Sequence, residues 1–396
     1  MPHLRFFAGP FALAAILLTT APAQQINHDV KVINIEVPVR VYKGDAFVDN
    51  LQRNDFELLE NGVPQDIDAV YLVRKTNVTR NEGGGAALPR TSRLFVLLFE
   101  MTEYQPEVAR AMDFFFDRVI EPQDELILLT PMKTYAMKSG TLTKTSRAKA
   151  KSDLLAKVRS DVMVGSSEYV GLIRDLTQIM SGNLDLDDKL QKYGETLSRL
   201  ESLRYIDEKK LVDFARLLKG REGQKHVFFF YQKEVVPKIN AKEIQKLMME
   251  NQDRPDIQLG LMEKFEFFKR DVSFDVAAVQ KAFSDSSIAV HFLYITRTRI
   301  ALADVTQNQS AALSMEEQSE DVFSAFSAIA RATGGLMDSS ASAEKSFQRA
   351  VEASENYYLL YYRPKDYKPD GTFREIVVRV KGGGVRVSHR LGYFAS

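Results

Sequence analysis

The sequence predicts an α/β protein in which a doubly wound, mostly parallel sheet is joined to a small antiparallel β-domain. Two observations predict the sheet. Continuous apolar runs recur in the middle of the chain, as in strands buried on both faces, and helical patterns separate them. A third observation predicts the β-domain, because both ends of the chain carry nearly alternating β-branched and aromatic residues.

The composition is typical of a folded protein of about two domains. The chain has 396 residues, of which 45% are hydrophobic and 27% are charged. Lys plus Arg and Asp plus Glu both number 53. We therefore expect no nucleic-acid partner, since nucleic-acid binding needs an excess of positive charge. The chain has no cysteine, which excludes disulfides, thiolate metal sites and cysteine nucleophiles.

Residues 1–23 have the pattern of a signal peptide. An apolar run from Phe6 to Leu18 follows Arg5, and Ala21-Pro22-Ala23 provides small residues at a cleavage site. The run is short for a membrane span, and a retained anchor is the alternative. We therefore expect a secreted or periplasmic protein that begins at Gln24 and has no membrane span after cleavage. The pattern does not distinguish the periplasm from the cell exterior.

Residues 24–73 are predicted to form the N-terminal β-domain. β-Branched residues nearly alternate from Val30 to Val41, and Lys43-Gly44-Asp45 supplies a turn. Asn61-Gly62 is typical of a type I′ hairpin, because both residues tolerate positive φ. Residues 74–93 contain three consecutive glycines and little apolar surface, so they are predicted to be a flexible linker.

Residues 94–340 are predicted to form the α/β domain. Its strands are expected at the continuous apolar runs 94–99, 126–130, 226–231 and 288–295. Helical spacing predicts helices at 106–119, 144–159, 190–203 and 211–218, with the last two paired to each other. The stretch near 236–271 is predicted to be an insertion, and its Phe265, Phe267 and Phe268 are expected in a core.

Residues 341–396 are predicted to form a C-terminal helix and antiparallel strands at 357–362, 373–380 and 385–390. Because an isolated hairpin is only marginally stable, we expect these strands to pack with the N-terminal β-domain. The tyrosine-rich strand 357–362 is expected to lie in the core, with presentation of its rings to a partner as the alternative.

Two markers lie in the β-rich ends of the chain. The first runs from Val48 to Gln65 and ends in Glu60-Asn61-Gly62-Val63-Pro64-Gln65. The second combines the strand 357–362 with Gly371-Thr372-Phe373-Arg374 and Arg390-Leu391-Gly392-Tyr393. With the order of the elements, these markers make nearly all of the mature chain similar to the secreted bacterial von Willebrand factor A-related family. The resemblance implies a Rossmann-like von Willebrand A domain flanked by β-strands.

Members of the wider fold usually carry a metal-ion-dependent adhesion site. It consists of an Asp-x-Ser-x-Ser loop after the first strand, a Thr on a second loop and an Asp after a later strand. The resemblance places the following residues at these positions: Glu100, Thr102 and Tyr104 in the first loop, Ser166 in the second and Gln232 in the third. The site is therefore degenerate.

The substitutions argue against a bound metal. Mg²⁺ requires near-ideal octahedral oxygen geometry, and a phenol such as Tyr104 is a poor ligand below its pKa. Gln232 lacks the charge of an Asp, and Lys233 adds a cation nearby, although Glu103 offers a replacement carboxylate. We expect no cofactor, with Mg²⁺ as the alternative. The simplest role for Glu100 and Thr102 is to cap the following helix.

Signatures of enzymes are weak, and catalysis is not expected. The five histidines are scattered along the chain, and His226 and His291 fall in predicted buried strands, where a core role is expected. The segment Gly165-Ser166-Ser167-Glu168-Tyr169 lacks the last glycine of a Gly-x-Ser-x-Gly nucleophile motif.

The sequence thus predicts an exported adhesion-type module that binds a protein partner without a metal. Its partner-binding rim is predicted to consist of Glu100, Thr102, Glu103, Tyr104, Ser166, Ser167, Tyr169 and Gln232. One alternative is a functional Mg²⁺-dependent adhesion domain that captures a partner carboxylate. An alternative of another class is a cell-envelope hydrolase that uses Ser166 or Ser167. The identity of the partner and the oligomeric state cannot be read from the sequence.

Overall fold

The computed structural model describes residues 33–83, 89, 91–203, 205–266, 274–295, 313–317, 319–339 and 342–396. The expected signal peptide, residues 1–23, lies outside the described residues. The chain divides into two units, Met1–Ile33 and Asn34–Ser396, and the elements below belong to the second. None of the helices within the described ranges has both the length and the apolar character that a membrane span needs.

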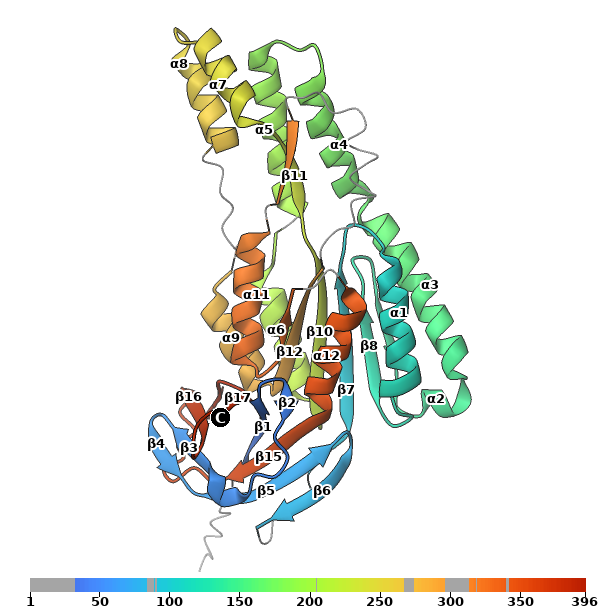
Figure 1. Cartoon of the computed structure of the whole chain (residues 1–396), viewed down its shortest axis with the longest axis vertical. Helices are drawn as coiled ribbons and strands as arrows, with labels where there is room; N and C mark the ends of the chain where they lie inside the picture. Colours follow the sequence, from blue (N-terminus) through green and yellow to red (C-terminus); the bar gives the residue numbers. More distant parts are fainter. Residues whose placement is uncertain are drawn as a thin grey trace, which may run out of the picture. The chain divides into compact units, whose positions relative to one another are not determined.

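A six-stranded sheet with the order β14-β12-β10-β7-β8-β9 forms the centre of an α/β region (Figure 1). Its strands are β7 (Arg93–Glu100), β8 (Glu125–Leu129), β9 (Thr134–Met137), β10 (Gln224–Gln232), β12 (Ile288–Ile295) and β14 (Met337–Asp338). The four pairings from β14 to β8 are parallel, and β9 pairs antiparallel with β8. The expected central strands are therefore present, and the fold class is mixed α/β.

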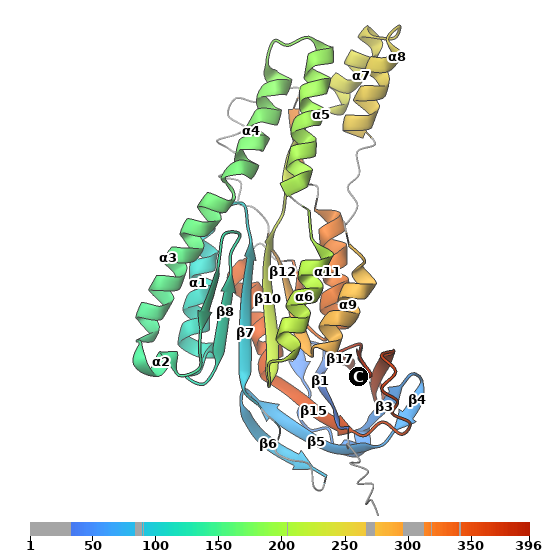
Figure 2. The ribbon, with the colours of Figure 1, turned by 180° about the vertical axis from the view of Figure 1, so that it is seen from behind.

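Helices cover both faces of this sheet (Figure 2). One face packs against α1 (Pro106–Phe114), α3 (Arg147–Gly165) and α12 (Ala343–Glu355), and the other against α6 (Glu208–Lys219), α9 (Val276–Asp285) and α11 (Glu320–Ala332). Side chains alternate along β7, so that Phe95 and Leu97 join the first core and Leu94 and Val96 the second. Burial on both faces explains why these strands read as continuous apolar runs.

The first of these helices begins as its sequence predicts. Pro106 occupies the first helical position of α1, where its missing N–H is no loss. A π-helical turn, Phe115–Val119, follows α1, and a short helix, α2 (Thr141–Lys144), precedes α3. Ser146 caps α3 by accepting a hydrogen bond from the Lys149 N–H.

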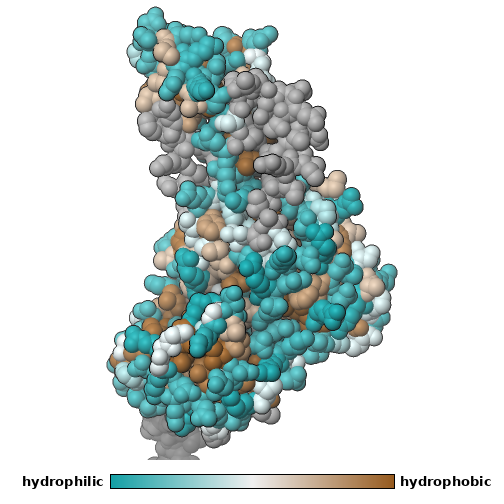
Figure 3. Space-filling view, viewed as in Figure 1, coloured by the Kyte–Doolittle hydropathy of each residue, from teal (hydrophilic) through white to brown (hydrophobic). Residues whose placement is uncertain are grey.

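A helical module lies beyond the carboxyl end of β10 (Figure 1), with helices from before and after this strand in the sequence. It consists of α4 (Ser167–Ser181), α5 (Leu186–Leu203), α7 (Ala241–Glu250), α8 (Pro255–Leu261), a π-helical turn (Met262–Glu266) and the paired strands β11 (Val235–Ile239) and β13 (Leu313–Glu317). A core of its own includes Leu176, Tyr193, Val236 and Phe265. The face of α7 and α8 visible in Figure 3 is mainly hydrophilic, which fits helices that bury only one side.

Two expectations for this module need comment. The predicted pairing of 190–203 with 211–218 is wrong: α5 packs against α4 and α8, whereas α6 lies on the central sheet. An amphipathic pattern shows which side of a helix is apolar but not which element covers it. Phe265 is buried against Tyr193, as expected of a core residue, and Phe267 and Phe268 lie outside the described residues.

Strands from both ends of the second unit form a β-domain. One sheet has the order β17-β1-β15-β5-β6 with β2 beside β1, and another has the order β18-β16-β3-β4. The strands are β1 (Ile35–Lys43), β2 (Ala46–Phe47), β3 (Phe56–Glu60), β4 (Val63–Gln65), β5 (Ile67–Arg74), β6 (Asn77–Glu82), β15 (Asn356–Tyr362), β16 (Phe373–Val380), β17 (Arg386–His389) and β18 (Gly392–Phe394). A short 3-10 turn, Arg53–Asp55, leads into β3. The C-terminal strands pack with the N-terminal ones, as expected.

One expectation for this domain is wrong, and the structure adds two details. The predicted flexible linker 74–93 contains β6, whose Val78 pairs with Val73 of β5, so an edge strand with polar alternate residues was missed. The three C-terminal strands pair with N-terminal strands in two sheets, β15 and β17 with β1 and β16 with β3. The helix assigned to the C-terminal region, α12, packs on the central sheet through Phe347.

Local expectations in the β-domain are confirmed. Asn61 and Gly62 have φ angles of 48° and 79°, so both residues of the β3–β4 turn adopt the left-handed conformation of a type I′ hairpin. Tyr357, Tyr358 and Tyr362 are buried, which places the tyrosine-rich strand in the core.

Candidate functional site

A cavity of about 530 Å³ lies where β7 and β10 end. In this sheet β8 lies on one side of β7 and β10 on the other, so successive crossovers leave β7 in opposite directions. Ligands of open α/β sheets bind outside the carboxyl ends of the strands at such a switch point. Four residues of the predicted rim line the cavity: Glu100, Thr102, Ser166 and Tyr169.

Gln232, the last residue of β10, holds the loop that follows β7. Its Oε1 accepts hydrogen bonds from the backbone N–H of Thr102 at 3.0 Å and of Glu103 at 2.9 Å, and from the Thr102 hydroxyl at 3.3 Å. Gln232 is fully buried, and its Nε2 has no hydrogen-bond partner among the described residues. The amide oxygen thus fixes the backbone of this loop from the neighbouring strand.

Glu100, at the end of β7, is exposed to the cavity. No hydrogen bond or ion pair joins its carboxyl to another described residue. The protein around the cavity partly desolvates this carboxyl, which raises its pKa from 4.5 to about 7. Glu100 therefore offers the cavity an acidic group that lacks a counter-ion within the described chain.

The expectation that Glu100 and Thr102 cap the next helix is wrong. Helix α1 begins at Pro106, its N-cap is Gln105, and no side chain accepts a hydrogen bond at this cap. Thr102 lies three residues before this N-cap, and its hydroxyl donates to Gln232 instead.

Glu103 and Tyr104 do not line the cavity. The Tyr104 ring packs against the core beneath α1 and α3, with the Arg159 guanidinium 5.9 Å from its centre. Burial raises the pKa of the Tyr104 hydroxyl. The backbone N–H of Glu103 donates a hydrogen bond to Gln232 and so helps to fix the loop after β7. Both residues were predicted to belong to the partner-binding rim, and neither lies on the wall of this cavity.

The second predicted loop is a junction between two helices. Helix α3 runs to Gly165, α4 starts at Ser167, and Ser166 between them keeps a right-handed helical conformation. The hydroxyls of Ser166 and Ser167 donate to the carbonyl oxygens of Met163 and Val164 at 3.4 and 2.7 Å. Neither hydroxyl is presented by a loop after a strand, and no histidine occurs among the described residues that line the cavity.

Tyr169 connects α4 to the start of β11. Its hydroxyl donates to the Val235 carbonyl oxygen at 3.1 Å and accepts from the Val235 N–H at 3.3 Å. The residue is buried and lines the cavity. Tyr169 thus lines the cavity and also joins α4 to the start of β11 within the helical module.

The sequence interpretation missed three residues of the cavity wall that bear charge. Glu234 is buried, and its Oε1 accepts a hydrogen bond of 2.5 Å from the Tyr231 hydroxyl. Glu168 and Lys210 are exposed and lie 3.9 Å from Arg199 and 4.0 Å from Asp207 respectively. The signal for Glu234 in the sequence is its place two positions after Gln232, at the carboxyl end of β10.

The cavity is therefore amphipathic and acidic. Carboxyl groups come from Glu100, Glu168 and Glu234, and one ammonium group comes from Lys210. Apolar side chains from the strands and helices, such as Leu98, complete the wall. Such a wall offers apolar contacts and carboxyl groups to a side chain with an apolar stem and a cationic end.

The donor set does not fit a Mg²⁺ ion. The Gln232 oxygen, at the position of the expected aspartate, already accepts hydrogen bonds from two backbone N–H groups. Within the described ranges, no three His, Cys, Asp or Glu side chains form a group that could hold a metal. Mg²⁺ requires six well-placed oxygens.

The two histidines of the predicted strands form a buried pair on one face of the sheet. His291 Nδ1 accepts a hydrogen bond from the Leu336 N–H, so its Nε2 carries the proton and faces His226 Nδ1 at 3.4 Å. Burial lowers the pKa of both imidazoles, that of His291 to about 3. A core role is confirmed for both residues.

Comparisons with known proteins give no family. No family model matches the chain, and no curated protein matches it. Among solved structures, the chain is similar to the human COPII-coat protein Sec24c with 9% sequence identity and a TM-score of 0.30. This similarity covers 77% of the chain and 44% of Sec24c, so the chain spans less than half of that protein's length. A similarity this low carries no argument about fold or function.

Proposed function

We propose that the chain is an exported protein-interaction module with a von Willebrand A-like domain, which binds a segment of a protein partner without a metal. The observation that carries the proposal is the 530 Å³ cavity at the carboxyl ends of β7 and β10, lined by Glu100, Thr102, Ser166 and Tyr169. It lies where open α/β sheets bind ligands, and its volume suits one or two side chains of a peptide.

The strand order supports the von Willebrand A-like part of the proposal. Counted along the chain within the central sheet, β7, β8, β9, β10, β12 and β14 have the spatial order 3-2-1-4-5-6. This is a doubly wound order, and here its third strand is antiparallel. In this arrangement the loops after the first and fourth strands meet, as those that contain Thr102 and Gln232 do.

The chemistry of the wall favours a basic partner segment. The cavity has three carboxyl groups, and its Lys210 is largely exposed. A partner Lys or Arg would place its aliphatic stem against Leu98 and its cation near Glu100, which has no counter-ion among the described residues. Long basic side chains bury such stems while their charge stays solvated or paired.

A peptide panel tests the binding proposal. Acetylated, fluorescein-labelled pentapeptides with a central Lys, Arg, norleucine or Glu would be titrated with the mature protein in EDTA, and anisotropy recorded. We expect the Lys and Arg peptides to bind about ten-fold more tightly than norleucine, about 1.4 kcal/mol, and the Glu peptide not to bind. Glu100→Gln should remove this preference, and Glu57→Gln, on exposed β3 surface, should keep it. Equal affinities for the four peptides would refute a basic partner segment.

Export has a separate test. The signal-peptide pattern over 1–23 predicts that the protein isolated from the periplasm or the medium begins at Gln24. N-terminal sequencing of the protein from fractionated cells checks this. Protein that begins at Met1 and remains in the cytoplasmic fraction would contradict export, without bearing on the cavity.

A further inference from the structure

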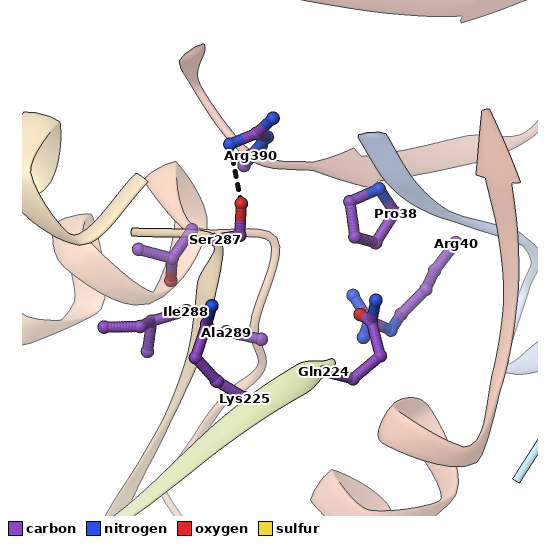
Figure 4. A pocket seen from close by; sticks show the side chains of 9 residues that line it. Pro38, Arg40, Gln224, Lys225, Ser287, Ile288, Ala289 and Arg390 are labelled. Atoms are coloured by element: carbon purple, nitrogen blue, oxygen red, sulfur yellow. Dashed lines mark hydrogen bonds between the residues drawn. The ribbon is translucent and has the colours of Figure 1, made fainter. Parts of the chain in front are cut away.

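Three buried cations surround a second, much smaller cavity at the opposite ends of β10 and β12. Arg40 comes from β1, Lys225 from β10 and Arg390 from the segment between β17 and β18, and they are 3%, 6% and 7% exposed. Figure 4 shows Lys225 and Gln224 reaching the cavity from β10, with Arg390 and Ser287 across it from them. The volume of this cavity is about 10 Å³.

Neutral oxygens accept the hydrogen bonds of these cations. Arg40 Nη1 donates to the Gly334 carbonyl oxygen at 3.1 Å, and Lys225 Nζ donates to the Arg221 carbonyl oxygen at 2.9 Å. Arg390 donates through Nη1 to the Ser287 hydroxyl at 2.7 Å and through Nη2 to a backbone carbonyl oxygen at 2.6 Å. The Nε atoms of both arginines have no hydrogen-bond partner among the described residues.

No carboxylate among the described residues forms an ion pair with any of the three cations. Glu36 attracts Lys225 and Arg390 electrostatically, and Asp285 attracts Arg390, but neither carboxylate forms an ion pair with them. The Glu36 carboxylate is hydrogen-bonded elsewhere: its Oε1 accepts from Gln224 Nε2 and its Oε2 from the Tyr361 hydroxyl, both at 2.8 Å. Charged side chains are almost never fully buried without a partner, because the desolvation cost is several kcal/mol per ion. Burial accordingly lowers the pKa of the Lys225 ammonium to about 8.

We infer that this cavity binds one monoatomic anion, chloride in the physiological setting, between Arg40, Lys225 and Arg390. A volume of about 10 Å³ is close to the minimum for one water-sized particle, so phosphate, sulfate and carboxylate ligands are too large. A chloride ion is somewhat larger than a water molecule, so its entry requires the side chains of Arg40, Lys225 and Arg390 to move slightly apart. The anion would offset one unit of the positive charge that β1, β10 and the segment after β17 bring together. It therefore joins the β-domain to the amino end of the central sheet and acts as a structural ion.

Thermal unfolding at constant ionic strength tests the inference. Chloride-free protein would be unfolded in sodium gluconate, sulfate, chloride or bromide. We expect 200 mM chloride to raise the melting temperature by roughly 2 °C above gluconate and the rise to saturate with chloride concentration, whereas the general stabilisation of proteins by sulfate does not saturate. Lys225→Met should abolish the difference between chloride and gluconate. Lys149→Met, a matched change at an exposed lysine on α3, should leave it intact. Identical melting temperatures in chloride and gluconate would overturn the inference and leave a water in the cavity.

Crystallography covers the case in which Lys225→Met does not fold. Wild-type crystals soaked in sodium bromide would be measured at the bromine absorption edge. The inference predicts an anomalous peak between Lys225 Nζ and the guanidinium groups of Arg40 and Arg390. Bromide peaks confined to the surface, with none in this cavity, would overturn it. Neither measurement depends on the function proposed for the larger cavity.

Discussion

The Oε1 atom of Gln232 lies 2.9 Å from the backbone nitrogen of Glu103 and accepts its hydrogen bond. This contact joins the end of β10 to the loop after β7 at the switch point of the sheet. The sequence resemblance to von Willebrand factor A-related proteins implies a metal-ligating aspartate at the position of Gln232. Here an amide oxygen holds the two strand ends together by hydrogen bonds within the chain.

Replacing Gln232 by Leu should lower the free energy of unfolding by about 2 kcal/mol. The N–H groups of Thr102 and Glu103 would lose their acceptor in a partly buried place, and such losses cost about 1–3 kcal/mol. Urea unfolding of Gln191→Leu, on the exposed side of α5, serves as the control. Equal stabilities of the two variants would show that the contact contributes nothing.

The raised pKa of Glu100 predicts a pH dependence of stability. Its folded pKa of about 7 exceeds the ordinary 4.5, so its contribution is fully present below pH 4.5 and is lost as the pH rises through 7. Because water reaches the side chain from the cavity, we expect a loss of no more than about 1 kcal/mol. Glu100→Gln should therefore be more stable than wild type at pH 8 and equal to it at pH 4. Chemical denaturation at both pH values measures this, and a variant less stable at pH 8 would contradict it.

The buried histidine pair predicts sensitivity to acid. The folded pKa values of His226 and His291 are below 6.5, so the unfolded chain binds more protons below pH 6.5 and stability falls as the pH falls. Each histidine contributes a slope of about 1.4 kcal/mol per pH unit, which for His291 continues towards pH 3. His291→Gln should reduce the slope of the unfolding free energy between pH 6.5 and 4.5. An NMR titration in which both rings gain protons near pH 6.5 would exclude this explanation.

Calorimetry separates the metal-free module from its Mg²⁺-dependent alternative. Titration of Mg²⁺ or Mn²⁺ into chelator-treated mature protein should give no saturable heat, because the Gln232 oxygen is engaged by two N–H groups. The melting temperature should also be unchanged in excess Mg²⁺. Saturable binding that Glu100→Ala removes would restore the metal-dependent reading.

The central strands were predictable because burial on both faces gives a continuous apolar run, as in Leu94 to Phe99. Strand β6 was not predictable, because an edge strand needs few apolar residues. Every second residue of β6 is polar and exposed, as Thr79 and Asn81 are. Because β7 and β10 are parallel neighbours in the sheet, Glu100 and Gln232 lie at the same edge of it. Sequence periodicity does not contain the order of the strands.

The junction at Ser166 escaped prediction for a different reason. Gly165-Ser166-Ser167 has low helix propensity and reads as a loop. The chain nevertheless continues as two helices, since Tyr169 binds the Val235 backbone and α4 joins the core of the helical module. Tertiary contacts between distant segments thus outweigh local propensity. Glu234 could not be assigned to the cavity wall from the sequence either, because the wall is formed by segments that are distant in the chain.

Site-specific photo-crosslinking tests the central claim most directly. Tyr205 lines the cavity and is exposed, whereas Val63 is exposed on β4 of the β-domain. A photoreactive phenylalanine would replace each residue in turn, and crosslinks would be collected in the native cell envelope with and without EDTA. The proposed function predicts a discrete protein adduct from position 205, absent from position 63, insensitive to EDTA and weakened by Glu100→Gln. An adduct that EDTA abolishes, or that forms equally from position 63, would contradict metal-free binding in this cavity.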